Sequence, residues 1–338
     1  MKELLKELCL INGISGDENL VREYIIEKVK DFCEYRVDNL GNLICFKKGK
    51  KVPEKRLMIA AHMDEVGFIV TSIKSDGTLK FGAVGGIDTG VMIGRQVKVG
   101  KNLISGVIGS AAVHNLTKEQ REKSPKTDDL YIDIGASDKE DAEKYVRLGD
   151  CVYFDSEFIE FGQNRLKSKA IDDRIGCAVM IELMRHELEY DTWFVFNVQE
   201  EIGLRGSGAS AYAVSPDIAV VLEATTASDI DGVSGANRVC ALGKGPVVSF
   251  MDRSTMYDKE LYRIAFETSA EEKIPCQTKS MIAGGNDSGA IHISGKGVRT
   301  LAVSVPCRYL HSPSCVIDYS DFENTYKLVN ALIKKVAE

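Results

Sequence analysis

The stretch RLMIAAHMDEVGF, residues 56–68, decides how this chain can fold. Its apolar run, residues 57–61, has the length and composition of a buried strand, and it delivers His62 followed by Asp64. A polar side chain that is buried without a partner costs on the order of 2 kcal/mol or more. We therefore expect His62 and Asp64 to meet other polar groups from distant parts of the sequence.

The composition limits the classes of partner. The 338 residues carry 43 basic and 50 acidic side chains, a formal charge of −7, and no block of Lys or Arg. This balance argues against nucleic acids and membrane surfaces as partners. The nine cysteines are scattered and form no CxxC pair, which predicts reduced thiols in a cytoplasmic protein. No segment approaches the roughly 18 consecutive apolar residues that a membrane span requires.

Two kinds of sequence pattern indicate two domains. Residues 1–66 and 164–338 alternate between helical and strand periodicity, whereas residues 67–163 consist of short strand-like runs separated by Gly-rich turns. We predict an α/β domain that is interrupted by an inserted all-β domain, in which only residues 138–147 look helical. The expected helices of the α/β domain are 3–10, 18–31, 173–186, 207–213, 259–272 and 319–336. Its expected strands are 57–61, 192–198, 217–222 and 301–305, together with a strand hairpin that turns at 39–42.

Acidic and histidine side chains follow the predicted strands of the α/β domain. They are His62 and Asp64, then Glu200 and Glu201, then Glu223, then His311, together with Asp172 and Asp173 at the start of a helix. In an open α/β sheet, ligands bind beyond the carboxyl ends of the strands, so these residues should converge. Singly, each has a simpler explanation: Asp172 as a helix N-cap, each His as a core residue, the Glu pair as a solvated turn. Their joint occurrence favours one site.

The residue types at this edge indicate a metal centre. Several carboxylates beside two imidazoles cannot all stay ionised without a strong counter-charge, and two divalent ions supply it. Nitrogen and carboxylate ligands without thiolate suit Zn, Co or Mn. Glu200 and Glu201 can both reach the site only if the strand ends there, so that one binds metal and the other moves a proton. No GxGxxG, GxxxxGK[ST], HExxH or GxSxG motif is present, which excludes the corresponding enzyme classes at motif level.

Five motifs in this order, AHMDEVGF, KAIDDRIG, QEEIGLRG, GGNDSGAIH and RYLHS, resemble those of the M42 metallo-aminopeptidases, the group of tetrahedral and glutamyl aminopeptidases. The similarity covers nearly the whole chain. It implies a dinuclear zinc or cobalt α/β peptidase domain with an inserted β-barrel-like dimerisation domain. It also implies a homo-oligomer, in which dimers assemble into a tetrahedral dodecamer that removes N-terminal residues from short peptides.

The resemblance also assigns roles to residues. His62 would be a terminal ligand of one metal, Asp172 the bridge, Glu201 and His311 ligands of the other metal, Glu200 the general base for attack by a metal-bridging hydroxide, and Asp64 the carboxylate that orients His62. The chain departs from the family where LEATTAS places Glu223 at a ligand position usually held by Asp, which leaves the metal preference open. AGGNDSG, with Asn286 where Thr is common, would by itself be a plain turn.

Two alternatives compete with the aminopeptidase. Some relatives are labelled endoglucanases, which raises the alternative of a glycosidase. A glycosidase would need two carboxylates but no metal, so His62 and His311 would have no role in catalysis. A non-catalytic assembly protein would show a lost ligand, and Glu223 is the one candidate for such a loss. Assembly itself is supported by the inserted β domain, whose strand edges could pair with a second subunit. The preferred N-terminal residue of the substrate cannot be derived from the sequence.

Overall fold

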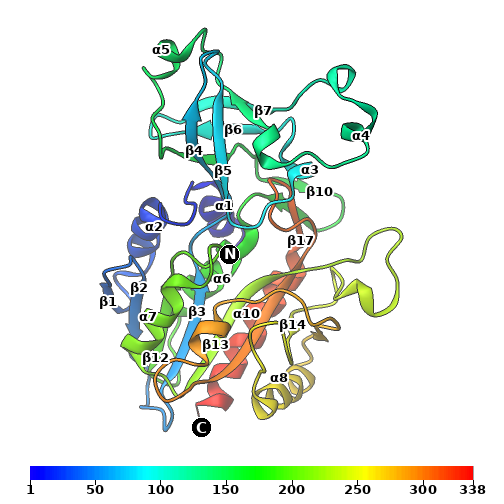
Figure 1. Ribbon diagram of the computed structural model, residues 1–338. Helices are drawn as coiled ribbons and strands as arrows, with labels where there is room; N and C mark the ends of the chain where they lie inside the picture. Colours follow the sequence, from blue (N-terminus) through cyan, green and yellow to red (C-terminus); the bar gives the residue numbers. More distant parts are fainter. Residues whose placement is uncertain (338) are drawn as a thin grey trace.

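A computed structural model describes residues 1–337 and places an eight-stranded sheet at the centre of the α/β layer (Figure 1). In spatial order its strands are β1 (Glu34–Val37), β2 (Leu43–Lys47), β12 (Thr192–Asn197), β3 (Leu57–His62), β13 (Ile218–Thr226), β16 (Arg299–Cys307), β14 (Val247–Val248) and β15 (Gln277–Thr278). The four strands β12, β3, β13 and β16 run parallel. Their carboxyl ends therefore meet at one edge of the sheet. This edge faces the inserted β domain, which lies at the top of Figure 1.

Helices cover both faces of this sheet. The larger core lies under α1 (Lys2–Leu10), α2 (Asn19–Val29), α6 (Ile171–Met184), α8 (Lys259–Glu271) and α10 (Tyr319–Val336), and the smaller core lies under α7 (Arg205–Val214) and α9 (Ser288–Ile291). Side chains of β3 alternate between the two: Ile59 packs in the larger core and Ala60 in the smaller one. This alternation is the period-two geometry of a strand that is covered on both sides.

The upper domain in Figure 1 is a closed six-stranded barrel with its own core. In spatial order its strands are β4 (Gly67–Ile73), β5 (Leu79–Val84), β8 (Tyr131–Asp133), β7 (Ile104–Gly109), β6 (Gln96–Val99) and β9 (Cys151–Phe154). The rings of Phe68, Phe81 and Phe154 meet edge to face inside it. The predicted fold class, an α/β domain with an inserted all-β barrel, is confirmed. Because the barrel is closed, its six strands have no free edges, so the edge-pairing argument for assembly is wrong for the barrel.

The insert contains more helix than the sequence predicts, but in shorter pieces. Of residues 138–147, only α5 (Lys139–Ala142) is an α-helix, because Asp138 caps a single turn that does not continue. Further turns of helix are α3 (Thr89–Met92), η1 (Val113–Asn115), α4 (Lys118–Arg121) and η2 (Thr127–Asp129). Within residues 1–337, no helix has both the length and the apolar character needed to cross a membrane.

A small third sheet joins the insert to the α/β domain. It consists of β10 (Ile159–Phe161), β11 (Arg165–Ser168) and β17 (Cys315–Asp318), all antiparallel. The sequence places the domain boundary at residue 163, within this sheet. We propose that the insert is better limited to residues 67–155, since β10 pairs with β11 and not with the barrel.

The start of α7 is pressed against the end of β12. A Cβ atom on Gly206 would lie 2.3 Å from Asn42 Oδ1 and 2.5 Å from the carbonyl oxygen of Val198. Asn42 is fully buried, accepts a hydrogen bond from the Val198 N–H and donates one to the Gly206 carbonyl. Glycine is therefore required at the last position of QEEIGLRG.

We predict that Gly206→Ala lowers the free energy of unfolding by about 1–3 kcal/mol, because backbone and a buried amide would have to move. The matched control is Gly208→Ala in the same helix, where the new Cβ would meet only Ala290 Cβ at 3.8 Å. That change should stabilise the protein by about 0.5–1 kcal/mol, because it removes a helical glycine. Thermal unfolding midpoints of both variants check the prediction, and equal midpoints would contradict it.

Candidate metal centre

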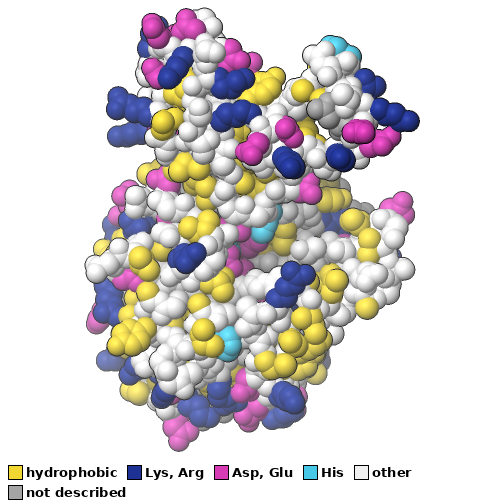
Figure 2. Space-filling view, in the orientation of Figure 1, with side chains coloured by type: hydrophobic (Ala, Val, Ile, Leu, Met, Phe, Trp, Pro, Cys, Tyr) yellow, Lys and Arg dark blue, Asp and Glu magenta, His cyan; other side chains and the backbone are white. Residues whose placement is uncertain are grey.

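The predicted residues converge where the parallel strands end. His62 is the last residue of β3, Glu223 lies near the end of β13, and His311 lies in the loop that follows β16. Asp172 lies in the first turn of α6, where the Asp172–Asp173 peptide bond is cis. Figure 2 shows a hollow between the barrel and the α/β layer, with a histidine and acidic side chains at its floor.

Asp172 lies between two pairs of possible ligands. Its Oδ1 is 3.4 Å from His62 Nε2, which is in turn 3.7 Å from Glu223 Oε2. Its Oδ2 is 3.5 Å from His311 Nε2, which is in turn 3.3 Å from Glu201 Oε2. The two carboxylate oxygens of Asp172 thus face two separate groups, each made of one imidazole and one carboxylate. This is the arrangement that a bridging ligand between two ions requires.

Both imidazoles are oriented through their other nitrogen. His62 Nδ1 lies 3.0 Å from the Asp64 carbonyl oxygen and 3.4 Å from Asp64 Oδ1. His311 Nδ1 lies 2.7 Å from the carbonyl oxygen of Gly86, which follows barrel strand β5. A carbonyl can only accept, so each Nδ1 carries a hydrogen and each Nε2 is left to face the cluster. The inserted barrel therefore contributes directly to the site.

Asp64 also holds the turn that carries the two glutamates. Its carboxylate accepts hydrogen bonds from the Glu200 N–H at 3.0 Å, the Glu201 N–H at 3.1 Å and the Ser15 hydroxyl at 2.6 Å. Strand β12 ends at Asn197, and Gln199 has a left-handed backbone with φ of 57°. The strand therefore ends before the glutamates, which is the condition that lets both side chains serve one site.

The cluster is electrostatically unfavourable without a counter-charge. Burial raises the pKa of Glu201 to about 8 and raises the pKa values of Glu200 and Glu223 well above their usual range. Burial would also raise the pKa of Asp172, but contacts with His311 and His62 lower it. Among residues 1–337, Asp172 Oδ1 and Glu223 Oε1 are buried without a hydrogen-bond partner. Unpartnered carboxylate oxygens beside imidazole nitrogens fit divalent ions of the zinc class.

Two further aspartates lie at the site: Asp173, which the sequence analysis placed among the converging side chains without giving it a role, and Asp287, which it did not include. Asp173 is fully buried and accepts hydrogen bonds from the Gly176 and His62 N–H groups, at 3.0 and 3.3 Å. Asp287 is also fully buried: its Oδ2 accepts a hydrogen bond from Asn197, and its Oδ1 has no partner among the described residues. AGGNDSG is therefore not a plain turn. The sequence contains a signal for the role of this segment, because GGNDSGAIH is one of the five motifs that resemble the family.

Other charged residues of the motifs build a support beneath the site. Arg174 has no exposed surface, and its guanidinium donates to the carbonyl oxygens of Leu8, Ile11, Gly13 and Met63. Lys169 Nζ lies 2.6 Å from Glu65 Oε1, and both side chains are 3% exposed. These contacts join the N-terminal segment, the end of β3 and the start of α6, which carry Ser15, His62 and Asp172.

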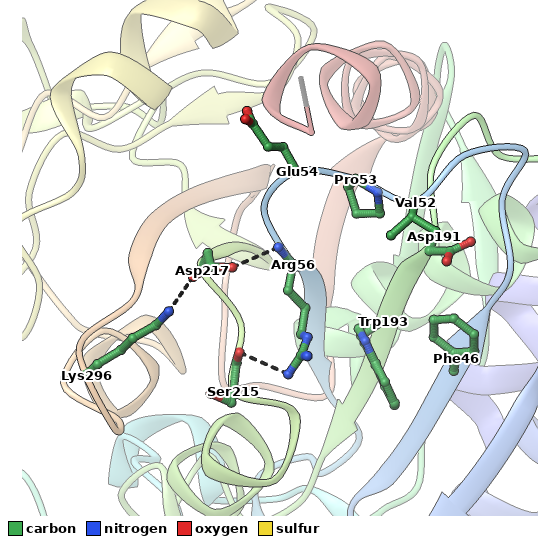
Figure 3. Close-up of a pocket in the computed structure, with 10 residues that line it drawn as sticks. All are labelled: Phe46, Val52, Pro53, Glu54, Arg56, Asp191, Trp193, Ser215, Asp217 and Lys296. Carbon is green, nitrogen blue, oxygen red and sulfur yellow. Dashed lines mark hydrogen bonds and ion pairs between the residues drawn. The ribbon is translucent and has the colours of Figure 1, made fainter.

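A larger cavity lies at the opposite edge of the sheet and takes no part in this site. It has a volume of about 480 Å3 and lies where the parallel strands begin (Figure 3). Three of the charged residues that line it contact one another or the backbone: Asp217 accepts from Lys296 and from the Arg56 N–H, and Arg56 donates to the Val214 carbonyl. The residues of the candidate metal centre line a separate and smaller cavity, around Asp172, Glu201 and His311.

Comparison with known proteins identifies the family. A family model described as M42 glutamyl aminopeptidase matches residues 41–328. The chain belongs to the M42 family of aminopeptidases, a metal-dependent group of peptide-bond hydrolases. The similarity predicted from the five motifs is therefore confirmed.

Individual aminopeptidases are similar to this chain over nearly its whole length. The lysyl aminopeptidase of Pyrococcus furiosus is 34% identical over 344 residues, which cover 99% of this chain and 97% of the relative. The structure of an aminopeptidase from Desulfurococcus kamchatkensis matches with a TM-score of 0.94 at 34% identity, covering 98% of this chain and 94% of that one. The TET1 peptidase of Pyrococcus horikoshii matches with a TM-score of 0.86 at 36% identity, covering 98% of both chains, and that peptidase can assemble into a tetrahedron or a large octahedral shell.

We predict that Asp64→Asn lowers kcat/KM by about 10–100-fold, because the amide cannot replace every hydrogen bond that the carboxylate accepts around His62 and the glutamate turn. Ser15→Ala is the matched control, since it removes one of these hydrogen bonds and leaves the carboxylate in place. Its loss should be smaller. Steady-state kinetics, with metal content measured alongside, test this, and an Asp64→Asn enzyme with wild-type kinetics would refute the orienting role.

Proposed function

We propose that this aminopeptidase holds two divalent ions per subunit and removes N-terminal residues from short peptides. His62 and Glu223 would bind one ion, His311 and Glu201 the other, and Asp172 would bridge them. The observation that carries this proposal is the position of Asp172, whose two oxygens face the two imidazole–carboxylate pairs. Glu223, at the position where Asp is usual, is only 5% exposed and turned toward His62. The longer side chain therefore still reaches the ligand position.

Zn or Co would suit these ligands best, and Mn remains compatible with them. When bound, such ions polarise a carbonyl group and lower the pKa of water to about 7. The protein's own part is to orient the imidazoles, to keep the carboxylates buried and to supply a proton carrier. The carbonyl groups of Asp64 and Gly86 orient the two imidazoles, and the Asp64 carboxylate holds the turn that carries the two glutamates.

Glu200 is the proposed proton carrier. It belongs to neither of the two pairs that Asp172 faces, and the Asp64 carboxylate fixes its backbone. Burial raises its pKa, and the charges of Asp287, Glu201 and Asp172 add to this effect. In this position Glu200 would take a proton from the attacking water and deliver it to the departing amine.

We predict that Glu200→Gln keeps the metal content of the wild type but lowers kcat by about 10²–10⁴-fold, because glutamine cannot accept the proton. Glu201→Gln is the control that separates the two roles: it removes a proposed ligand, so metal content should fall together with activity. Elemental analysis and hydrolysis of an aminoacyl anilide measure both quantities. Full activity in Glu200→Gln would eliminate the assigned base, and hydrolysis of a β-glucan by metal-free protein would favour the glycosidase alternative.

We further propose that the chain forms a homo-oligomer in which the barrel contacts a second subunit, with twelve chains in a tetrahedral particle. The TET1 peptidase of Pyrococcus horikoshii supports such an assembly by analogy. On the barrel, apolar side chains are exposed at Ile69, Ile93, Val107 and Leu148. Val107 lies at a surface depression of about 410 Å3. An exposed apolar side chain beside a depression, such as Val107, is suited to burial between subunits.

Light scattering should give a particle mass that corresponds to twelve copies of the 37.1 kDa chain. Val107→Arg should reduce the particle mass, because a buried apolar contact would become a charged one. A wild-type protein that is monomeric at micromolar concentration would defeat this prediction.

We also propose that the protein is located in the cytoplasm. All nine cysteines are free thiols, and thiols stay reduced in that compartment.

A further inference from the structure

The backbone N–H groups of the turn that carries the two glutamates, residues 198–201, are held by side chains. Strand β12 has ended before this turn, and each of the four N–H groups donates to a side-chain oxygen from a distant part of the chain. Asn42 accepts from the first group, and the Asp64 carboxylate accepts from the last two. The second group, the N–H of Gln199, donates to Glu18 Oε1 at 3.0 Å. The N-terminal segment therefore takes part in holding this turn.

Gln199 is the residue of this turn whose backbone most needs support. Its φ of 57° is left-handed, a conformation that costs a residue with a side chain on the order of 1 kcal/mol or more. Its carbonyl oxygen accepts a hydrogen bond from the Arg205 N–H at 3.1 Å, and its N–H donates to Glu18. The peptide units on both sides of this Cα atom are therefore fixed. Together they set the direction in which the chain continues to Glu200 and Glu201.

Glu18 is a buried acid whose carboxylate binds backbone N–H groups. The residue is 4% exposed, and its Oε1 accepts from the Gly16 N–H at 2.8 Å as well as from the Gln199 N–H. Burial raises the pKa of Glu18, and the charge of Asp64 adds to this effect. An acid at this place is therefore unfavourable by itself, and the two hydrogen bonds offset part of the cost of its burial.

Helix formation does not explain a glutamate at position 18. Glu18 is the N-cap residue of α2, a position where Asp, Asn, Ser and Thr are preferred because their short side chains accept a hydrogen bond from the first turn. Glu18 makes no such capping bond. Its longer side chain instead reaches away from the helix to the Gln199 N–H. The stability of α2 alone would favour a shorter residue, so the length of Glu18 serves the contact with the turn.

We propose that Glu18 is a positioning residue for the reaction: by binding the Gln199 N–H it fixes the turn and thereby the placement of Glu200 and Glu201. The inference rests on the proposed function, in which Glu200 carries the proton and Glu201 binds a metal ion. The contact requires the reach of the Glu18 side chain more than its charge, because an amide oxygen also accepts a hydrogen bond from an N–H group.

The test separates the reach of the side chain from its charge. Glu18→Gln keeps an acceptor oxygen at the same reach without the charge, whereas Glu18→Asp keeps the charge on a side chain that is one methylene shorter. For an aminoacyl anilide, kcat should stay within about 3-fold of the wild type in Glu18→Gln and fall by about 10–100-fold in Glu18→Asp, while KM changes by less than about 3-fold in both. Aspartate is a preferred N-cap residue, so Glu18→Asp should fold with α2 intact.

The matched control is Tyr24→Phe in the same helix. It removes the hydrogen bond that the Tyr24 hydroxyl donates to Glu7 and leaves the contact with the turn in place. Both kcat and KM should remain those of the wild type. A loss of kcat in this control equal to that in Glu18→Asp would show that any disturbance of α2 lowers activity, and it would overturn the proposal.

Amide hydrogen exchange of the metal-free protein measures the turn without relying on activity. The N–H groups of residues 199–201 should exchange faster in Glu18→Asp than in the wild type, and at the wild-type rate in Glu18→Gln. Exchange in α2 should be the same in all three proteins. Faster exchange throughout α2 in Glu18→Asp would mean that the helix is lost, which contradicts a specific role in the turn.

Two further results would overturn the proposal. Wild-type kcat in Glu18→Asp would show that the contact with Gln199 is not needed, and an equal loss of kcat in Glu18→Gln and Glu18→Asp would show that the charge matters and not the reach. If metal-loaded wild-type enzyme hydrolyses no aminoacyl anilide, the proposed function fails instead, and the exchange rates of residues 199–201 still decide whether Glu18 holds the turn.

Discussion

The structure depends on the burial of negative charge at one edge of a parallel sheet. Asp172, Glu201 and Glu223 all lie at 11% exposure or less, and two further buried aspartates stand beside them. Carboxylates this close repel one another, and burial removes the water that would screen them. The imidazoles of His62 and His311 offset only part of that repulsion. A counter-charge bound by the folded chain alone would therefore stabilise the fold as well as serve the reaction.

A second set of buried charged side chains holds the segments that carry this cluster in place. Arg174 donates to four carbonyl oxygens in the N-terminal segment and at the end of β3, and Lys169 pairs with Glu65. Buried ionic groups are tolerated when every donor has a partner, and they are costly when one partner is lost. Because Arg174 follows Asp172 by two residues, the same short stretch of α6 both presents the carboxylate that we propose as the bridge and anchors it.

The inserted barrel also contributes a loop to the candidate site. The loop after β5 passes beside the site, where the Gly86 carbonyl holds His311 and a Cβ on Gly85 would lie 3.3 Å from Glu201 Cβ. Gly85 has φ of 85°, a conformation that glycine adopts without strain. His311 itself has φ of 56°, which is uncommon for a side-chain-bearing residue. The two domains therefore share the task of placing this imidazole.

The sequence by itself determined the alternation of helices and strands, the inserted all-β domain, and the edge at which His62, Glu200, Glu201, Glu223 and His311 gather. These features follow from local periodicity and from the rule that ligands lie beyond the strand ends. Only the tertiary structure decided that the barrel closes, that β10 joins β11, and that Asp287 and Gly86 belong beside the site. Each of these depends on contacts between residues far apart in the chain, and no local pattern encodes which of many loops will reach a given strand end.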